Sequence, residues 1–382
     1  MEQIYLDHAA TTPISKEVLE TMNEASLNAF GNPSSIHSFG RNARKLLDDA
    51  RAVIANAIGA KEKEIIFTSG GTESDNLALI GTALKNKARG KHIITTTAEH
   101  HAILHAAQFL ETEGFDVTYL PVSETGTVSP DDLKAALRDD TILVSIMFAN
   151  NETGVIQPIT ELSNILEDHG AYFHVDAVQA FGTFEINVKE LGIDLLSVSG
   201  HKISGPKGIG FLYAGENVAF APLSYGGEQE RKHRAGTENT PGIAGLAKAV
   251  ELAAAHRAEN RAKYRSCRDT FIKRLTEEEI EYSVNGNLDE LIPSTVNISF
   301  PGTNVEQLLV NFDLSGIAAA SGSACTAGSH EPSHVLVAMF GTEDERTKNS
   351  VRFSFGSLNT EEQAAEAAGR IAKIVRRLAK RR

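Results

Sequence analysis

Residues 141–200 carry three short apolar runs, TILVSIMF (141–148), AYFHVDAV (171–178) and LLSVSG (195–200), with helix-like stretches between them. Four more runs rich in β-branched residues flank them along the chain: EIIFTS (64–69), HIITTT (92–97), DVTYLPV (116–122) and GIGFLYA (208–214). Strands that alternate with helices favour a mostly parallel sheet with helices on both faces. The sequence therefore predicts an α/β fold with a mostly parallel, seven-stranded sheet.

The pattern changes near Gly242. A long helical segment over 242–275 leads into a smaller α+β region, which contains the strand-like runs STVNISF (294–300) and SVRFSFG (350–356) and a final helix. A chain of 382 residues is too long for one simple core, so a division is expected. We expect a large domain over 16–255 and a small C-terminal domain over 256–382.

The composition is that of an ordinary globular protein, with 41% hydrophobic and 23% charged residues. No apolar run approaches the roughly 18–20 residues that cross a bilayer, and the start MEQIYLDHAATTP does not resemble a leader. These features predict a cytoplasmic protein without a membrane partner. The net charge of -13 argues against direct nucleic-acid binding. The basic tail RIAKIVRRLAKRR (370–382) favours a final amphipathic helix, with a docking patch for an acidic partner as the alternative.

The two cysteines, Cys267 and Cys325, are too few and too far apart for a disulfide framework or a metal site, and no metal is expected. Cys267 lies in KYRSCRDTFIKRL (263–275), which reads as a helix, so it is expected to be an ordinary helix residue. Cys325 lies in AAASGSACTAGSHEPS (318–333), where small residues surround it without hydrophobic periodicity. The two thiols therefore have to be judged separately.

The strongest local signal is SVSGHKISGPKGIG (197–210), in which a strand runs into Ser199, Gly200, His201 and Lys202. A lysine at the end of a strand, beside small residues, is well placed to form a Schiff base with a carbonyl cofactor. Most single lysines are solvated surface groups, so the neighbouring motifs decide how this one is interpreted.

Upstream, FTSGGTESDN (67–76) reads as a strand, a glycine turn and a helix start. Gly70, Gly71 and Thr72 would present backbone N–H groups and a hydroxyl there, which suits a phosphate. A turn with a threonine N-cap is the alternative for this segment alone.

Two further strand ends carry polar side chains. Asp176 follows an apolar strand, where a buried carboxylate needs a cationic partner such as a protonated pyridine nitrogen; capping of the next helix is the alternative. His100 and His101 follow another strand, where an imidazole could stack on a ring and move protons, although single histidines are more often structural. Because ligands of open α/β sheets gather at the carboxyl ends of strands, the combination predicts a pyridoxal 5'-phosphate (PLP) site.

Ten segments carry a family resemblance: YLDHAATTP (5–13), FGNPSSIHSFGR (30–41), TSGGTESDN (68–76), EHHAIL (99–104), NNETGVIQP (150–158), HVDAVQ (174–179), SVSGHKISGPKGIG (197–210), RAGTEN (234–239), SGSACT (321–326) and SVRFSFG (350–356). In these segments the chain resembles the NifS/IscS cysteine desulfurases, PLP enzymes related to class V aminotransferases and built on fold type I. The SGSACT segment resembles group I of that family. The resemblance covers about residues 4–360.

The resemblance implies a role for individual positions. It implies that Lys202 binds PLP, Asp176 contacts the pyridine nitrogen, Gln179 contacts the ring hydroxyl and His100, in preference to His101, stacks on the ring. The phosphate would be held by Gly71, Thr72, Ser199, His201 and, across the interface of a homodimer, Thr237. Asn151 and Arg352 would bind the substrate carboxylate, and Asn151 would also contact the cofactor. A surface strand arginine is the less favoured interpretation of Arg352.

The implied reaction converts L-cysteine to L-alanine and leaves the sulfur as a persulfide on Cys325, with Lys202 moving the α-proton and His100 helping to form the thiolate. A sulfur-acceptor protein for iron–sulfur cluster assembly or tRNA thiolation would then receive the sulfur. Residues 1–15 would pack on the small domain, which carries the cysteine loop. His330, in the cysteine loop, and His233, in the dimer segment, differ from the residues that the family usually has at these positions.

Two other classes of function are compatible with parts of this sequence. A PLP-dependent lyase or aminotransferase of the same fold, such as a selenocysteine lyase, would make Cys325 incidental, and alanine production from cysteine would separate the two readings. An interaction hub for a sulfur-relay partner would show activity mainly when that partner is present.

Overall fold

The computed structural model describes residues 3–322 and 332–379, and Cys325 and His330 lie outside these ranges. Its central sheet has seven strands in the order β2-β8-β7-β6-β5-β3-β4. The strands are β2 (Ile65–Thr68), β3 (His92–Thr96), β4 (Asp116–Leu120), β5 (Thr141–Ser145), β6 (Tyr172–Asp176), β7 (Leu195–Ser199) and β8 (Gly210–Ala214). β8 runs opposite to the other six strands, so the predicted mostly parallel, seven-stranded sheet is confirmed.

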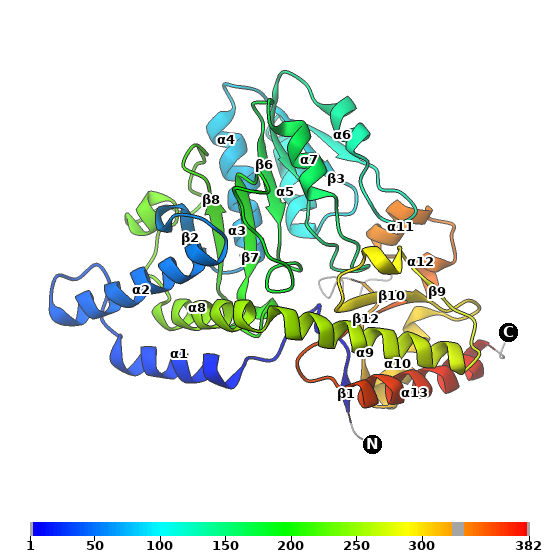
Figure 1. The fold of residues 1–382 in the computed structure, drawn as a ribbon. Coiled ribbons are helices and arrows are strands. Elements are labelled where there is room, and N and C mark those ends of the chain that lie inside the picture. The colour runs from blue at the N-terminus through cyan, green and yellow to red at the C-terminus, as the bar shows by residue number, and fades with distance from the viewer. Residues whose placement is uncertain (1–2, 323–331, 380–382) are drawn as a thin grey trace.

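Helices cover both faces of this sheet (Figure 1). Successive side chains of a strand point to opposite faces, and here both faces are apolar. In β5, for example, Leu143 packs into one cluster with α5 (His101–Thr112), and Val144 packs into another with α2 (Ser38–Ala57) and α7 (Ile159–Leu166). This burial on both sides is why the strands read as continuous apolar runs.

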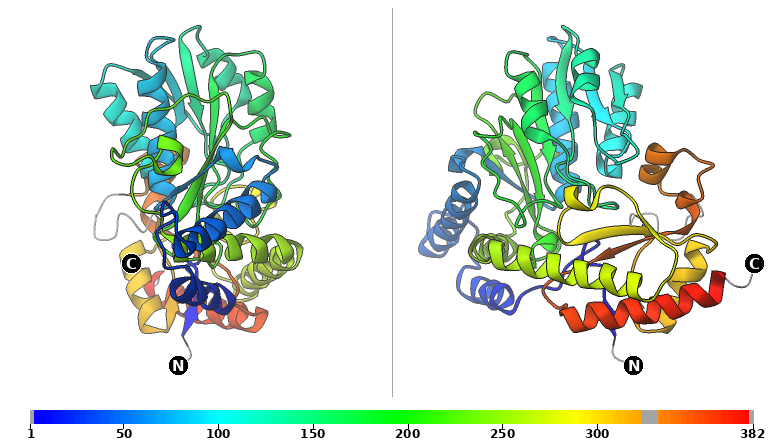
Figure 2. Two further views of the ribbon diagram at one scale, coloured as in Figure 1. Left: turned by 90° about the vertical axis from the view of Figure 1, so that its left-hand side faces the viewer. Right: turned by 45° about the vertical axis from the view of Figure 1, so that its right-hand side comes forward.

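The helical segment predicted over 242–275 is two helices in the structure, α8 (Thr240–Ala255) and α9 (Arg257–Glu277). His256 separates them with φ -104° and ψ 9°, and its backbone N–H bonds to Leu252 O. The two helices pack on different partners, because α8 contacts α1 (Lys16–Asn28) and α2, whereas α9 contacts α13 (Glu361–Ala379). Figure 2 shows α9 and α13 side by side in the lower part of the molecule.

The smaller part contains a three-stranded antiparallel sheet in the order β12-β10-β9 and a two-stranded parallel sheet of β1 and β11. These strands are β1 (Ile4–Tyr5), β9 (Ser283–Val284), β10 (Thr295–Ser299), β11 (Ile317–Ala318) and β12 (Ser350–Ser354). The N-terminal strand therefore lies beside a strand that is more than three hundred positions away in sequence.

The remaining helices are short except for α10. They are α3 (Gly71–Asn76), α4 (Thr82–Asn86), α6 (Pro130–Ala136), α10 (Val305–Leu314), α11 (His334–Phe340) and α12 (Arg346–Asn349). A π-helical turn over Leu77–Gly81 joins α3 to α4, and such turns are frequent near functional sites. Within the described ranges, no helix is both long and apolar enough to cross a membrane.

Candidate active site

A cavity of about 180 Å³ lies where the carboxyl ends of β2, β6 and β7 meet the N-terminal segment and β12. It is lined by Ala9, Ala10, Gly71, Thr72, Asp75, His100, Met147, Asn151, Asp176, Val178, Gln179, Ser199, His201, Lys202 and Arg352. Of the candidate residues predicted from sequence within the described ranges, only Gly70, His101 and Thr237 are outside this set. Segments far apart in the sequence thus meet at one edge of the sheet, where ligands of α/β folds bind.

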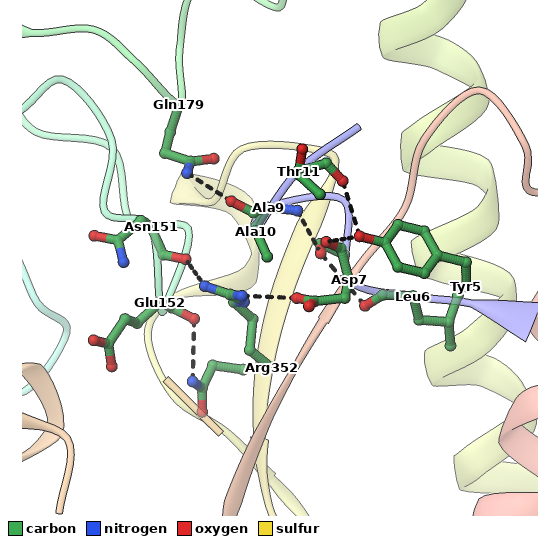
Figure 3. A network of polar contacts seen from close by, with 12 residues as sticks. Tyr5, Leu6, Asp7, Ala9, Ala10, Thr11, Asn151, Glu152, Gln179 and Arg352 are labelled. Atoms are coloured by element: carbon green, nitrogen blue, oxygen red, sulfur yellow. Dashed lines mark hydrogen bonds and ion pairs between the residues drawn. The ribbon is translucent and has the colours of Figure 1, made fainter. Parts of the chain in front are cut away.

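Lys202 ends the short 3-10 turn that follows β7, and this turn carries its side chain into the cavity. The lysine Nζ donates to the carbonyl oxygens of Ala9 and Ala10, the latter at 3.0 Å. The Gln179 amide also donates to Ala9 O, at 3.0 Å (Figure 3). The N-terminal segment therefore forms one wall of the site and holds the lysine amine there.

Asp176 ends β6 with only 6% of its surface exposed. Its Oδ1 accepts the Val178 N–H at 2.9 Å, and it forms no ion pair within the described ranges. Burial raises the pKa of Asp176, whereas the nearby His100 and Lys202 act in the opposite direction. A buried carboxylate without an ion pair in the described part of the chain fits a ligand that brings a cation, as a protonated pyridine nitrogen does.

The glycine turn after β2 leaves room beside Ser199. Gly70 has φ +149°, which favours glycine, and a Cβ on Gly71 would lie 2.8 Å from Val178 Cγ2. A side chain at Gly71 would therefore collide with Val178, so this close turn requires glycine. Because Thr72, Ser199 and His201 line the same end of the cavity, this cradle fits a phosphate.

His201 contributes a neutral imidazole to that cradle. Burial first, and then the charges of Lys202 and Lys207, lower the pKa of His201 to about 4. Its Nδ1 lies 3.1 Å from Thr11 Oγ1. A bound phosphate would act against this lowering, since an anion stabilises the charged imidazole.

The structure separates His100 from His101. His100 is the N-cap of α5, lines the cavity and accepts the Ala102 N–H at Nδ1, 3.1 Å away. The neutral ring in this arrangement carries its proton on Nε2. His101 is outside the lining, and its ring packs 4.5 Å from the ring of His334. Burial first, and then the neighbouring histidines, lower the pKa of His101 to about 4.

Arg352 and Asn151 close the opposite end of the cavity. Arg352 lies in β12 with 1% of its surface exposed, so it is not a surface strand arginine. Its Nη1 donates to Asn151 O at 2.7 Å and its Nη2 donates to Asp7 Oδ1 at 2.8 Å (Figure 3). A buried guanidinium at the end of a cavity that contains a lysine suits a substrate carboxylate.

Thr237 lies away from this cavity, in a second one of about 250 Å³ beside Phe67 and Glu230. His233, in the same segment, stacks on Phe220 with ring centroids 4.4 Å apart. A larger cavity of about 550 Å³ shares Ala9, Gln179 and Lys202 with the candidate site. Its lining lacks the carboxylate, imidazole and guanidinium groups described above, so we assign the chemistry to the smaller cavity.

Sequence reasoning missed three acidic residues at the site. Asp7 contacts Arg352, Asp75 lines the cavity behind Gly71, and Glu99 is fully buried next to His100. All three lie within the motifs quoted above, in YLDHAATTP, TSGGTESDN and EHHAIL. Their position inside these motifs was the one signal in the sequence that could have identified them. The sequence does not show that these acidic side chains are buried.

The aminotransferase class-V family model matches residues 4–366. The chain is 58% identical over 378 residues to a putative cysteine desulfurase, IscS 1, of Bacillus subtilis strain 168, covering 99% of this chain and 100% of that protein. Its fold is similar to that of a solved NifS-like protein, with a TM-score of 0.92, 35% identity and coverage of 98% and 100%. It is also similar to the solved structure of SspA in complex with cysteine, with a TM-score of 0.81, 38% identity and coverage of 92% and 98%.

Proposed function

The chain belongs to the aminotransferase class-V family, and we propose that it is a PLP-dependent cysteine desulfurase that works in the 180 Å³ cavity. The observation that carries this proposal is the meeting of Lys202, Asp176 and Arg352 in that one cavity. The names of its relatives, which are 46–58% identical to it, support the same activity.

The residues of the site fit PLP. Lys202 would attach the cofactor, Asp176 would pair with its ring nitrogen, Gln179 would contact its hydroxyl and His100 would stack on its ring. The phosphate would lie against Gly71, Thr72, Ser199 and His201, with Thr237 of a second copy completing the site in a homodimer. When bound, PLP withdraws electrons from the substrate carbon next to the amino group.

The protein groups then position the substrate and move protons. Arg352 and Asn151 bind the α-carboxylate of L-cysteine, because a guanidinium meets a carboxylate with two parallel N–H donors. Lys202 is the base that removes the α-proton and later returns a proton. The carbonyl oxygens of Ala9 and Ala10 can hold its ammonium form between these steps.

Cys325 would accept the sulfur, a role inferred from the sequence because this residue lies outside the described ranges. Its thiolate attacks the substrate sulfur, so that a carbon–sulfur bond breaks and a sulfur–sulfur bond forms. The substrate β-carbon gains a proton, L-alanine leaves, and no external oxidant is required. To serve as the base for Cys325, His100 first has to release the Ala102 amide that its Nδ1 accepts.

The persulfide would pass to an acceptor protein for iron–sulfur cluster assembly or tRNA thiolation. This cytoplasmic role extends the proposal beyond the cavity. An acceptor has to reach Cys325, so the sulfur leaves by way of the segment that carries this residue. Addition of an acceptor should therefore raise turnover without changing the ratio of alanine to sulfur.

The decisive experiment compares wild type with Lys202→Ala and Cys325→Ser. Wild type loaded with PLP should show the absorbance band of PLP that is bound to a lysine. It should also form alanine and sulfide together from L-cysteine in the presence of a reductant. Cys325→Ser should keep the absorbance and lose persulfide and sulfide, whereas Lys202→Ala should lose both. Normal turnover by Cys325→Ser, or keto-acid-dependent amino transfer without sulfide, would point to another PLP reaction.

A further inference from the structure

Asp7 binds the one guanidinium that lines the candidate site in the described ranges. Its Oδ1 accepts a hydrogen bond from Arg352 Nη2 at 2.8 Å, and the Asn151 carbonyl oxygen accepts one from Arg352 Nη1 at 2.7 Å (Figure 3). Arg352 Nε is buried without a hydrogen-bond partner in the described ranges. Arginine has five N–H donors, so donors remain for a substrate carboxylate after both contacts are made.

The backbone of the N-terminal segment holds Asp7 in place. Asp7 forms a parallel bridge with Ser354 in β12, the strand that carries Arg352. The Tyr5 hydroxyl donates to Asp7 O at 3.0 Å, and the Ala9 N–H donates to Ser354 Oγ at 2.8 Å. Asp7 and Arg352 are thus fixed relative to each other by contacts other than their own ion pair.

We infer that Asp7 is a positioning residue for substrate binding, which orients the Arg352 guanidinium so that its remaining N–H groups meet the α-carboxylate. This inference rests on the proposed function, in which Arg352 binds that carboxylate. The carbonyls of Ala9 and Ala10, two and three residues after Asp7, hold Lys202, so one short segment places both the carboxylate-binding and the proton-transferring group.

Two effects of Asp7 on substrate binding oppose each other. Its negative charge repels a second carboxylate, whereas its hydrogen bond holds the guanidinium in one orientation. Orientation should dominate, because Arg352 is 1% exposed and would otherwise turn toward other acceptors to satisfy its charge. The position of the Asp7 oxygen, rather than its charge, then determines affinity.

A pair of variants separates position from charge. Asp7→Asn keeps the acceptor oxygen in place and removes the charge, whereas Asp7→Glu keeps the charge and moves the oxygen by one methylene. Calorimetry on the PLP-loaded protein should use 3-mercaptopropionate, which lacks the amino group and so reports the carboxylate contact. Its amide serves as a probe without a carboxylate.

We expect Asp7→Glu to weaken 3-mercaptopropionate binding about ten-fold and Asp7→Asn to change it less than about three-fold, with amide binding the same in all proteins. The KM for L-cysteine should rise in parallel in Asp7→Glu with little change in kcat. Weaker binding by Asp7→Asn than by Asp7→Glu, or equal binding by all three proteins, would overturn the inference. Arg352→Gln, which removes the charge, provides the separate check, since retained preference for the carboxylate in that variant would instead overturn the proposed substrate site.

Discussion

The Asp75 carboxylate lies 3.7 Å from Nε2 of His174, and both side chains are enclosed behind the candidate active site. His174 lies between Ser145 Oγ and Ser197 Oγ, at 2.8 and 2.9 Å, and burial lowers its pKa to about 3. The imidazole is therefore neutral and gives Asp75 no cation. Burial, and then the negative charge of Asp176, raise the pKa of Asp75 well above its ordinary value.

This arrangement predicts that Asp75 carries a proton, and in the proposed function Asp176 is the ionised partner of the cofactor. Asp75→Asn should then leave the dissociation constant for PLP within about three-fold of wild type, because an amide resembles a protonated carboxyl. Asp176→Asn should weaken PLP binding by about ten-fold or more, since it removes the ionic partner of the ring nitrogen. Fluorescence titration of the apoprotein with PLP measures both constants.

The opposite order of effects would show that Asp75 is the ionised acid. Asp75→Leu provides a further comparison, because it is similar in size but makes no hydrogen bond. If Asp75 only fills space, Asp75→Leu should bind PLP as well as Asp75→Asn does. If its proton is needed for hydrogen bonding, only the amide variant should bind normally.

Glu99 predicts a specific dependence of stability on pH. Burial raises the pKa of Glu99 to about 8 from an ordinary 4.5, although Oε1 accepts from Met147 N at 2.9 Å and Thr96 Oγ1 at 3.1 Å. Its contribution to stability is fully present below the unfolded pKa and is lost as pH rises to the folded pKa. Between about pH 4.5 and 8, the free energy of unfolding attributable to Glu99 should fall.

Glu99→Gln should remove this loss, because glutamine cannot ionise. The difference in unfolding free energy between Glu99→Gln and wild type should therefore grow in favour of the variant from pH 5 to pH 8. Urea unfolding of the apoprotein at several pH values measures it, with the exposed Glu113→Gln as the matched control. A difference that stays constant with pH would mean that Glu99 is ionised in the folded protein.

The fold was predictable because burial leaves a pattern in the sequence. The apolar runs that became β5, β6 and β7 are buried on both faces, and no charge interrupts them before Asp176. The break at His256 was not predictable, since residues on both sides of it favour helix and only the packing partners differ. The domain boundary near residue 255 stays a prediction, and α11 packs in the same apolar cluster as the central sheet.

The position of Lys202 in the cavity was predictable because it follows a recognisable apolar strand beside small residues, whereas its role stays a prediction. The resemblance supplied the choice between His100 and His101, which neither residue's local sequence could decide. Asp7 could not be found this way, because its contact with Arg352 joins positions separated by 345 residues. This contact depends on the bridge between Asp7 and Ser354 of β12, and the sequence does not specify that pairing.

Arg51 and Glu230 form a buried ion pair that fixes a strained turn. Two hydrogen bonds of 2.8 and 2.7 Å join them, and Glu230 Oε2 also accepts the Phe67 N–H. Glu230, Arg231 and Lys232 have φ values of 44°, 55° and 70°, which are unfavourable for residues with a Cβ. We expect Arg51→Met to lower the free energy of unfolding by about 3–5 kcal/mol, because it leaves a buried, unpaired carboxylate.

Denaturant unfolding of the single and double variants tests this explanation. Arg51→Met with Glu230→Met should recover part of the loss, because no buried charge remains. The matched control is Lys45→Met, which breaks the exposed pair with Asp49 and should leave the unfolding curve unchanged. A double variant less stable than Arg51→Met would show that the pair is needed to hold the strained turn itself.

We expect the Cys267 thiol to be unreactive toward thiol reagents in the folded protein. It lies in α9 with 1% of its surface exposed, within the apolar cluster that contains Phe271. Burial raises its pKa, so both the thiolate fraction and access to reagents are low.

Native Cys325→Ser should therefore react with no more than a trace of a thiol reagent, whereas the denatured variant should bind one equivalent. Peptide mapping of the labelled wild type, with Cys267→Ala as the matched control, assigns the reactive position. Rapid modification of Cys267 in the native protein would mean that α9 opens readily and that a thiol other than Cys325 could accept sulfur.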